Sequence, residues 1–332
     1  MRLFKNPDIN FLRWRWHAVA FSWVIIIAGL AVIWTKGLPK GIEFAGGTSV
    51  IAQFDQQASV EAVRRSLNQN YPGGGENAIV QEYGDAAQRQ VMVRVPQVGA
   101  ESGSSLSTTA KAVEGALRKG GLPPFKIIGT EIVGPAVGEE LTRKGTSAMV
   151  LSLLGLLAYI GFRFQFSFAV GAVIATIHDL LVTLAFLAFF QYDMSLNVIA
   201  AILTVTGYST NDTIVIFDRV RENMRSMRRE SLGTVINTSI NQTLGRTIIT
   251  GGLTLLSAVA LFVFGGEVLR GFSFTMIVGV ITGTYSSVFV AAAIVTFWNR
   301  KSARMAAASE AAPTAANQPP RRSKAQRKAK AS

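Results

Sequence analysis

Six long apolar runs dominate the pattern of hydrophobic and polar positions. They cover residues 18–35, 146–162, 167–190, 195–217, 247–265 and 271–298. Each is close to the roughly 20 residues that a helix needs to cross a hydrocarbon core about 30 Å thick. The later runs are rich in Gly, Ser and Thr, which let helices pack closely in lipid. The pattern predicts a polytopic α-helical membrane protein with six transmembrane helices, one at 18–35 and five within 146–298.

The first run also has the basic start and apolar centre of a signal peptide. It is long, however, and ends in Trp34, Lys36 and Pro39, without the small-x-small pattern of a cleavage site. Between a cleaved signal and an uncleaved first span, the sequence favours the span.

The segment between the first two runs, residues 36–145, has the shorter periodicities of a small folded domain. Alternating apolar positions predict four strands. These lie at 42–54, 78–83, 89–96 and 125–133. Helices are predicted at 60–69, with Ser59 as the N-cap, and at about 104–119, where Gly120 and Gly121 follow. The order β-α-β-β-α-β is that of a ferredoxin-like α+β domain.

Charge is unevenly distributed along the chain and orients the predicted bundle. Only 16% of the 332 residues are charged, yet 33 Lys and Arg against 20 Asp and Glu give a net charge of +13. If the chain crosses the membrane six times, four of its segments lie on the same side of the membrane. These segments are 1–17, 163–166, 218–246 and 299–332, and together they hold 20 basic and five acidic residues. The positive-inside rule then predicts cytoplasmic termini, at 1–17 and 299–332, and an extracytoplasmic domain at 36–145.

The composition excludes several kinds of site. The chain has no Cys and two His, which rules out a disulfide scaffold, a thiol nucleophile and a Cys-ligated metal. Residues 41–48, GIEFAGGT, have the outline of a phosphate-binding loop, but Gly47 stands where its Lys should be. A glycine bend at a strand, where backbone approaches closely, explains these residues more simply. We therefore expect no enzyme activity, no metal and no cofactor.

Two basic segments are expected outside the bundle. Residues 221–230 predict a basic loop, and the tail at 299–332 is Ala- and Pro-rich before it becomes strongly basic. The tail lacks apolar periodicity, which predicts disorder. Attraction to anionic lipid explains its charge better than nucleic acid does, because no aromatic residues are interleaved for base stacking.

A few ionisable residues fall inside the predicted spans, where a charge costs roughly 2.5–3.5 kcal/mol and needs a reason. Asp179 follows His178 in the third run, Asp212 lies in the fourth, and Arg246 opens the fifth. A carboxyl removed from water can hold a proton, and a nearby Arg favours its release, so the two together can drive a proton-coupled motor. The alternative is a static polar cluster, in which Asp212 is bonded to Arg246 or to Thr hydroxyls. Asp193 falls in a short outer loop and is expected to be solvated.

Several motifs together resemble the SecF group of the SecD/SecF family, over about residues 10–300. Three stretches resemble particular parts of the family. Residues 41–48 resemble the entry to the outer domain, residues 133–141 the approach to the second span, and residues 241–247 the start of the fifth span. His178-Asp179 matches a pair in the third span. Residues 207–223, GYSTNDTIVIFDRVREN, are similar to the most distinctive stretch of the family. Glu43 departs from the pattern, in which Asp is usual, and keeps the charge.

The resemblance implies an accessory subunit of the bacterial Sec translocase in the cytoplasmic membrane. Members of this branch of the resistance–nodulation–division superfamily use the proton gradient, with protons as the coupling ion, to help export proteins. The partners implied are SecD, the SecYEG channel and the translocating preprotein. Asp212 and Arg246 align with residues of the proton pathway, and Asp179 is a further candidate. Asn211, Thr247 and Thr250 are expected to support them with polar contacts.

Two other functions remain open from the sequence. Half of a small-molecule exporter of the same superfamily should have a larger outer domain with a substrate cavity. A scaffold that only stabilises membrane partners should tolerate neutral residues at Asp212 and Arg246.

Overall fold

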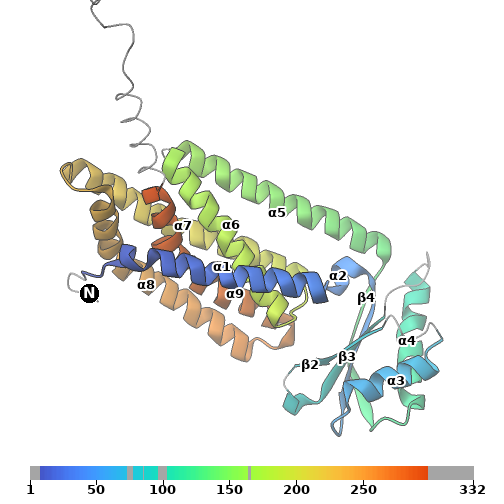
Figure 1. Cartoon of the computed structure of the whole chain (residues 1–332). Coiled ribbons are helices and arrows are strands. Elements are labelled where there is room, and N and C mark those ends of the chain that lie inside the picture. Colours follow the sequence, from blue (N-terminus) through green and yellow to red (C-terminus); the bar gives the residue numbers. More distant parts are fainter. Residues whose placement is uncertain (1–7, 73–77, 85, 96–102, 164–165, 298–332) are drawn as a thin grey trace, which may run out of the picture.

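The computed structural model describes residues 8–72, 78–84, 86–95, 103–163 and 166–297. Long helices lie side by side in a bundle, and a small domain with a β-sheet is attached at one end of it (Figure 1). The N-terminal end of the first helix lies at the opposite end of the bundle. The predicted tail at 299–332 and residues 1–7 fall outside the described residues.

Most helices of the bundle are longer than the apolar runs that predicted them. Their bounds are α1 Phe11–Lys36, α5 Pro135–Arg163, α6 Phe166–Phe189, α7 Leu196–Ser226, α8 Leu232–Phe264 and α9 Glu267–Ser286, which continues through a π-helical turn, η2, Ser287–Ala291. The predicted basic loop at 221–230 is wrong in its first half, because residues 221–226 are the last turns of α7. Arg and Glu favour helix, and Arg219 pairs with Glu222 at 2.5 Å along the exposed surface.

Five helical segments of the described residues are long and apolar enough to cross a membrane. They are Phe11–Lys36, Val137–Arg163, Phe168–Phe189, Leu232–Phe264 and Val268–Phe297. The remaining expected span, 195–217, lies in α7, which is 31 residues long but more polar. Its polar positions include Thr206, Ser209 and Asp212, which are buried against other helices. The structure is therefore that of a helical membrane protein in which α7 is the polar centre of the bundle.

The attached domain contains a four-stranded antiparallel sheet with two helices on one face. Its elements are β1 Gly47–Phe54, α3 Val60–Asn70, β2 Ile79–Tyr83, η1 Ala86–Gln88, β3 Gln90–Val95, α4 Gly103–Lys119 and β4 Phe125–Val133. The strand order is β2-β3-β1-β4. Val50 and Val93 of the sheet pack against Val63 of α3 and Leu117 of α4, all fully buried. Ser59 caps α3 as predicted, by accepting a hydrogen bond from the Ala62 amide.

The strand predicted over 42–54 is wrong in its first part. Residues Ile42–Ala45 form a short helical turn, α2, and the strand begins only at Gly47. Gly46 and Gly47 both have positive φ, +68° and +114°, so the chain reverses there in a conformation that favours glycine. A Cβ at Gly41 would lie 2.8 Å from the Met194 carbonyl oxygen, so this glycine permits a close backbone approach. The glycine bend predicted for residues 41–48 is therefore present at this junction.

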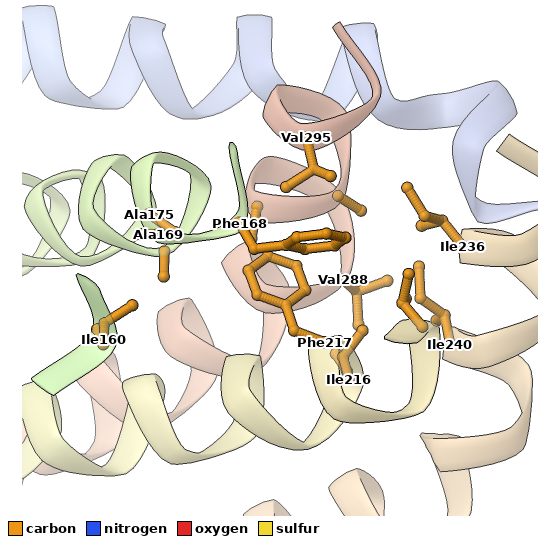
Figure 2. Close-up of a cluster of buried hydrophobic side chains, with 14 of the residues drawn as sticks. Ile160, Phe168, Ala169, Ala175, Ile216, Phe217, Ile236, Ile240, Val288 and Val295 are labelled. Atoms are coloured by element: carbon orange, nitrogen blue, oxygen red, sulfur yellow. The ribbon is translucent and has the colours of Figure 1, made fainter. Parts of the chain in front are cut away.

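The main apolar core of the bundle lies at the end far from the sheet. Phe168 of α6 and Phe217 of α7 meet edge to face with ring centroids 5.1 Å apart, and Val288 and Val295 lie beside them (Figure 2). At the same end, Asn237 and Asn241 of α8 bind backbone groups of residues 9 and 11. These contacts hold the start of α1 against α8.

An ion pair joins the sheet domain to the bundle. Arg94 of β3, on the face of the sheet away from α3 and α4, places its Nη2 2.7 Å from Asp193 Oδ2 in the turn between α6 and α7. Their side chains are 6% and 21% exposed, so the expectation of a solvated Asp193 is wrong. Arg94 Nη1 also donates to the Lys40 carbonyl oxygen at 2.8 Å. Lys40 forms a parallel β-bridge with Met194, which continues the same junction.

Candidate functional site

Asp212 lies on the buried side of α7, where that helix meets α8. Its residue exposure is 5%. Oδ1 accepts a hydrogen bond of 2.9 Å from the Thr247 hydroxyl. Oδ2 is buried and has no hydrogen-bond partner among the described residues. One oxygen of the carboxyl group is thus held in place, and the other is buried without a hydrogen-bond partner among the described residues.

Arg246 precedes Thr247 and points to the outer surface of the described chain. Its guanidinium forms no salt bridge with Asp212 in the described part of the chain. Asn211 and Thr250 are exposed on the same side of α7 and α8. The structure therefore brings Thr247 to Asp212 and leaves Asn211, Arg246 and Thr250 on an open face.

Asp179 forms a second buried polar cluster, on α6. Its Oδ1 lies 3.0 Å from His178 Nδ1. Its Oδ2 accepts hydrogen bonds from Ser209 of α7 and from Ser286 of α9, the latter at 2.8 Å. Asp179 is 2% exposed. This carboxylate has several partners, which distinguishes it from Asp212.

Ser209 and Ser286 were missed as site residues. Ser209 is three positions before Asp212, inside the distinctive 207–223 stretch, so the motif pointed to its neighbourhood. Ser286 lies 107 positions from Asp179 and has no sequence signal of its own. It directly precedes the π-helical turn η2, whose first residue, Ser287, shares a 2.7 Å hydrogen bond with Thr213. Such turns often occur at functional sites.

The arrangement can store and release a proton at a carboxyl group, and the side chains present offer little other chemistry. In the parts of the chain that the structure describes, no group of three or more His, Cys, Asp or Glu could hold a metal ion. Buried hydroxyls from two helices, α7 and α9, bind Asp179, and one hydroxyl orients Asp212. Buried ionisable groups of this kind mark ion and proton pathways in membrane proteins.

Comparison with known proteins identifies the family. The family described as "Protein export membrane protein SecD/SecF, C-terminal" matches residues 113–301, more than half of the chain. The chain belongs to the SecD/SecF family. A second match, to the SecD/SecF GG motif, covers residues 31–58 and includes the glycines at the junction of α2 and β1. The resemblance seen in the sequence is confirmed.

Relatives and solved structures extend this SecD/SecF match to nearly the whole chain. The protein translocase subunit SecF of Pseudomonas aeruginosa is 42% identical over 295 residues, 89% of this chain and 93% of the relative. The SecF of Escherichia coli O157:H7 is 37% identical over 86% of each chain. A crystal structure of SecDF from Thermus thermophilus superposes with a TM-score of 0.78 at 32% identity. SecDF in a super-membrane-facing form gives 0.65 at 34% identity.

The match to SecDF covers 89% of this chain but only 39% of the longer SecDF chain. Together with the SecF relatives, this places the chain at the SecF part of that polypeptide. By its family and relatives, the chain is a multi-pass membrane protein and a translocase subunit, not an enzyme, as predicted.

Proposed function

We propose that the chain is the SecF subunit of a bacterial Sec translocase and that, with SecD, it uses the proton gradient to assist protein export across the cytoplasmic membrane. The observation that carries the proposal is the carboxyl group of Asp212. It is buried at the centre of a helical bundle, with one oxygen held by Thr247 and the other unpaired. A group that served only packing would satisfy both oxygens, because an unpaired buried polar atom costs about 1–3 kcal/mol.

In this proposal Asp212 takes up a proton, and Arg246 favours its release. When the guanidinium is distant, desolvation favours the neutral carboxyl, and when it approaches, it favours the carboxylate. Thr247 keeps Oδ1 in place in either state, since its hydroxyl can donate to both forms. Asp179, with His178 and two Ser hydroxyls, is proposed as a secondary proton-pathway residue whose hydrogen bonds would change when α7 and α9 shift.

The proposal includes six spans, with α7 as the fourth, and a ferredoxin-like outer domain. The β-α-β-β-α-β order and the strand order β2-β3-β1-β4 support this domain type. Cytoplasmic termini and an extracytoplasmic 36–145 are proposed from the distribution of basic residues. The sheet lies at the end of the bundle away from the start of α1, which agrees with this topology (Figure 1).

The further proposed partners are the SecYEG channel and the translocating preprotein. The domain 36–145 would relay motion of the bundle to the emerging chain through its junction at Lys40 and Asp193. The basic tail at 299–332, outside the described residues, would bind anionic lipid at the inner surface.

SecD is proposed to cover the open face of α7 and α8. Exposed small or polar residues recur there at helical spacing, in segments proposed to lie within the membrane. On α7 they are Ala200, Thr204, Gly207 and Asn211, and on α8 Arg246, Thr250 and Ser257. Lipid chains would leave Asn211 and Arg246 without partners, whereas a second helical bundle can supply them and can approach closely at small residues.

Replacing Gly207 with Leu should weaken the complex with SecD. A Cβ at Gly207 would meet nothing within 4 Å in this chain, so the larger side chain does not disturb its own packing. It would project into the partner instead. We expect at least a tenfold drop in co-purified SecD, because overpacking at a close contact costs about 1–3 kcal/mol. Gly155→Leu is the matched control, since Gly155 of α5 is also exposed and free of neighbours. Equal SecD recovery from both variants would place the partner elsewhere.

Complementation tests the function as a whole. In cells depleted of their own SecF, this chain expressed with its SecD should restore export, and a protonophore should remove the gain. Restoration that persists with the protonophore would favour the scaffold over the proton-driven motor. Efflux of small molecules by the chain without SecD would favour the exporter.

A further inference from the structure

The short helix α2 packs against the first turns of α5, at the end of the bundle that carries the sheet domain (Figure 1). A Cβ on Gly138 of α5 would lie 3.4 Å from the carbonyl oxygens of Glu43 and Phe44, so the backbone of α2 lies directly on α5. An open cavity of about 550 Å³ adjoins this contact, within the range of about 300–1,000 Å³ for pockets that bind small molecules. The residues that line it include Phe44, Ala45, Glu139, Arg143, Thr146 and Ser147.

The cavity lies at the level where α5 enters the membrane. Arg143 and Arg163 are 20 positions apart in this helix. That separation is about 30 Å along the helix axis, which is the thickness of a hydrocarbon core. Residues 145–162 between them carry no charge. The guanidinium of Arg143 and the hydroxyls of Thr146 and Ser147 therefore lie at the headgroups of the leaflet on the side of the sheet domain.

Glu139 and Arg143 line this cavity without pairing with each other. The neighbouring Glu140 and Lys144 have the same spacing of four residues and form a salt bridge of 2.7 Å. Among the described residues, neither Glu139 nor Arg143 has a salt-bridge partner. Their charges are therefore available to a ligand in the cavity.

Two hydroxyl groups of the cavity are available in the same way. Within the described part of the chain, Thr146 and Ser147 donate no hydrogen bond, whereas Thr142 donates to the Gly138 carbonyl oxygen at 2.8 Å. The cavity thus offers a cation, an anion and two hydroxyls to one ligand.

The order of these groups along α5 matches a zwitterionic phospholipid. Ser147, Arg143 and Glu139 follow one another at intervals of four residues, so they lie along one face of the helix from the membrane outwards. Hydroxyl and guanidinium groups can donate to a phosphate, and a carboxylate can accept from an ammonium group. In phosphatidylethanolamine the phosphate is nearer the acyl chains and the primary amine is further out, which is the same order.

Apolar side chains continue this face of α5 into the membrane. Val150, Leu151 and Leu154 are 47%, 67% and 56% exposed, so the described chain leaves them largely uncovered. Only 6% of the most apolar stretch of α5 is buried, against 17–67% for the other four candidate spans. An acyl chain can lie on this surface below a headgroup in the cavity.

We propose that the cavity binds the headgroup of one phosphatidylethanolamine molecule in the leaflet on the side of the sheet domain. Arg143, Thr146 and Ser147 donate to its phosphate, and Glu139 accepts from its ammonium group. The bound lipid fills the space between α2 and α5 and so holds the base of the sheet domain at the membrane surface. This inference does not depend on the proposed proton site, so either can fail without the other.

Native mass spectrometry of the complex with SecD tests the site. The complex is mixed with phosphatidylethanolamine or with phosphatidylglycerol of the same acyl chains. The measured quantity is the lipid that the unmodified complex retains and a variant loses, because SecD can bind lipid of its own. We expect the site to retain phosphatidylethanolamine at least about tenfold better, since phosphatidylglycerol has the phosphate but lacks the amine that Glu139 binds.

Two variants separate the two ends of the headgroup. Arg143→Gln should lower the retention of both lipids about tenfold, because its charge-assisted hydrogen bonds to the phosphate are lost. Glu139→Gln should instead remove the preference for phosphatidylethanolamine and leave phosphate binding in place. An Arg143→Gln complex that holds as much lipid as the unmodified one would overturn the site.

Lys144→Gln and Glu140→Gln are the matched controls. They remove the same charges one position further along α5, from a pair that does not line the cavity. Both should retain the lipid as the unmodified complex does. Equal losses in Arg143→Gln and Lys144→Gln would reduce the effect to general basic charge and would also overturn the site.

The unmodified complex provides a further test. Equal retention of the two lipids would show that no zwitterionic headgroup is recognised. Lipid that binds to the chain alone but not to the complex would show that SecD covers the cavity. Asp212→Asn should keep the lipid, because Asp212 lies on another helix, so loss of lipid and loss of proton coupling are separate results. Co-purification with SecD shows that each variant is folded and assembled.

Discussion

Replacing Asp212 with asparagine should abolish the gain in export that the proton gradient provides, while the complex with SecD still assembles. Asparagine has nearly the same shape and keeps an oxygen that can accept the hydrogen bond from Thr247. It cannot bind or release a proton. It also removes the cost of burying a charge, so the protein should be at least as stable. The measurement is export into membrane vesicles after ATP-driven entry, with and without a gradient.

Asp218→Asn is the matched control on the same helix. Asp218 lies six residues further along α7, is 48% exposed and pairs with Arg163 at 3.3 Å. An exposed pair contributes about 0–1 kcal/mol, and we expect this variant to export normally. Gradient-dependent export at the normal level in Asp212→Asn would remove Asp212 from the mechanism.

Replacing Arg94 with alanine should detach the sheet domain from the bundle. The change leaves Asp193 Oδ2 without its 2.7 Å partner and the Lys40 carbonyl without its donor. Breaking a fully buried pair costs about 3–5 kcal/mol. Asp193 retains some exposure, so we expect about 2–3 kcal/mol in the free energy of docking the domain.

A disulfide between Cys introduced at Lys40 and Met194 measures this docking. The chain has no Cys of its own, so the two introduced residues are the only ones in it. Backbone hydrogen bonds of 2.7 Å on each side of the bridge hold these positions together. The rate of cross-linking should fall when Arg94→Ala is added. Arg118→Ala, which breaks an exposed pair with Glu114 on α4, should have no effect. Equal rates in both would show that the ion pair does not hold the domain.

Much of the fold follows from periodicity alone. The strand at 125–133 and the helix capped by Ser59 are where the alternation and the capping residue predicted them. Their signals are local, because apolar spacing and capping act within a few residues. The turn at Ile42–Ala45 was missed because apolar residues at 42 and 44 suit a strand equally well. Only the positive φ of Gly46 and Gly47 shows where the chain reverses.

The candidate site was predicted in part. Asp212 and Thr247 stood out because a carboxyl and polar residues are costly in an apolar run, and the structure brings them together. Helical spacing did not predict on which side Asn211 and Arg246 would lie, since that depends on which neighbours pack against α7 and α8. Ser286 had no signal, because Ser is common in membrane helices and only its position opposite a carboxyl makes it notable.

The sequence by itself determined that this is a polytopic membrane protein with a small α+β domain, and it identified the carboxyl groups that require an explanation. These conclusions depend on the length, periodicity and cost of burial of local segments. The tertiary structure decided that Asp193 pairs with Arg94 and that both carboxylate oxygens of Asp179 are bonded while Asp212 has an unpaired oxygen. Those facts depend on residues up to 107 positions apart, and only the packing of helices on one another brings such residues within hydrogen-bond distance.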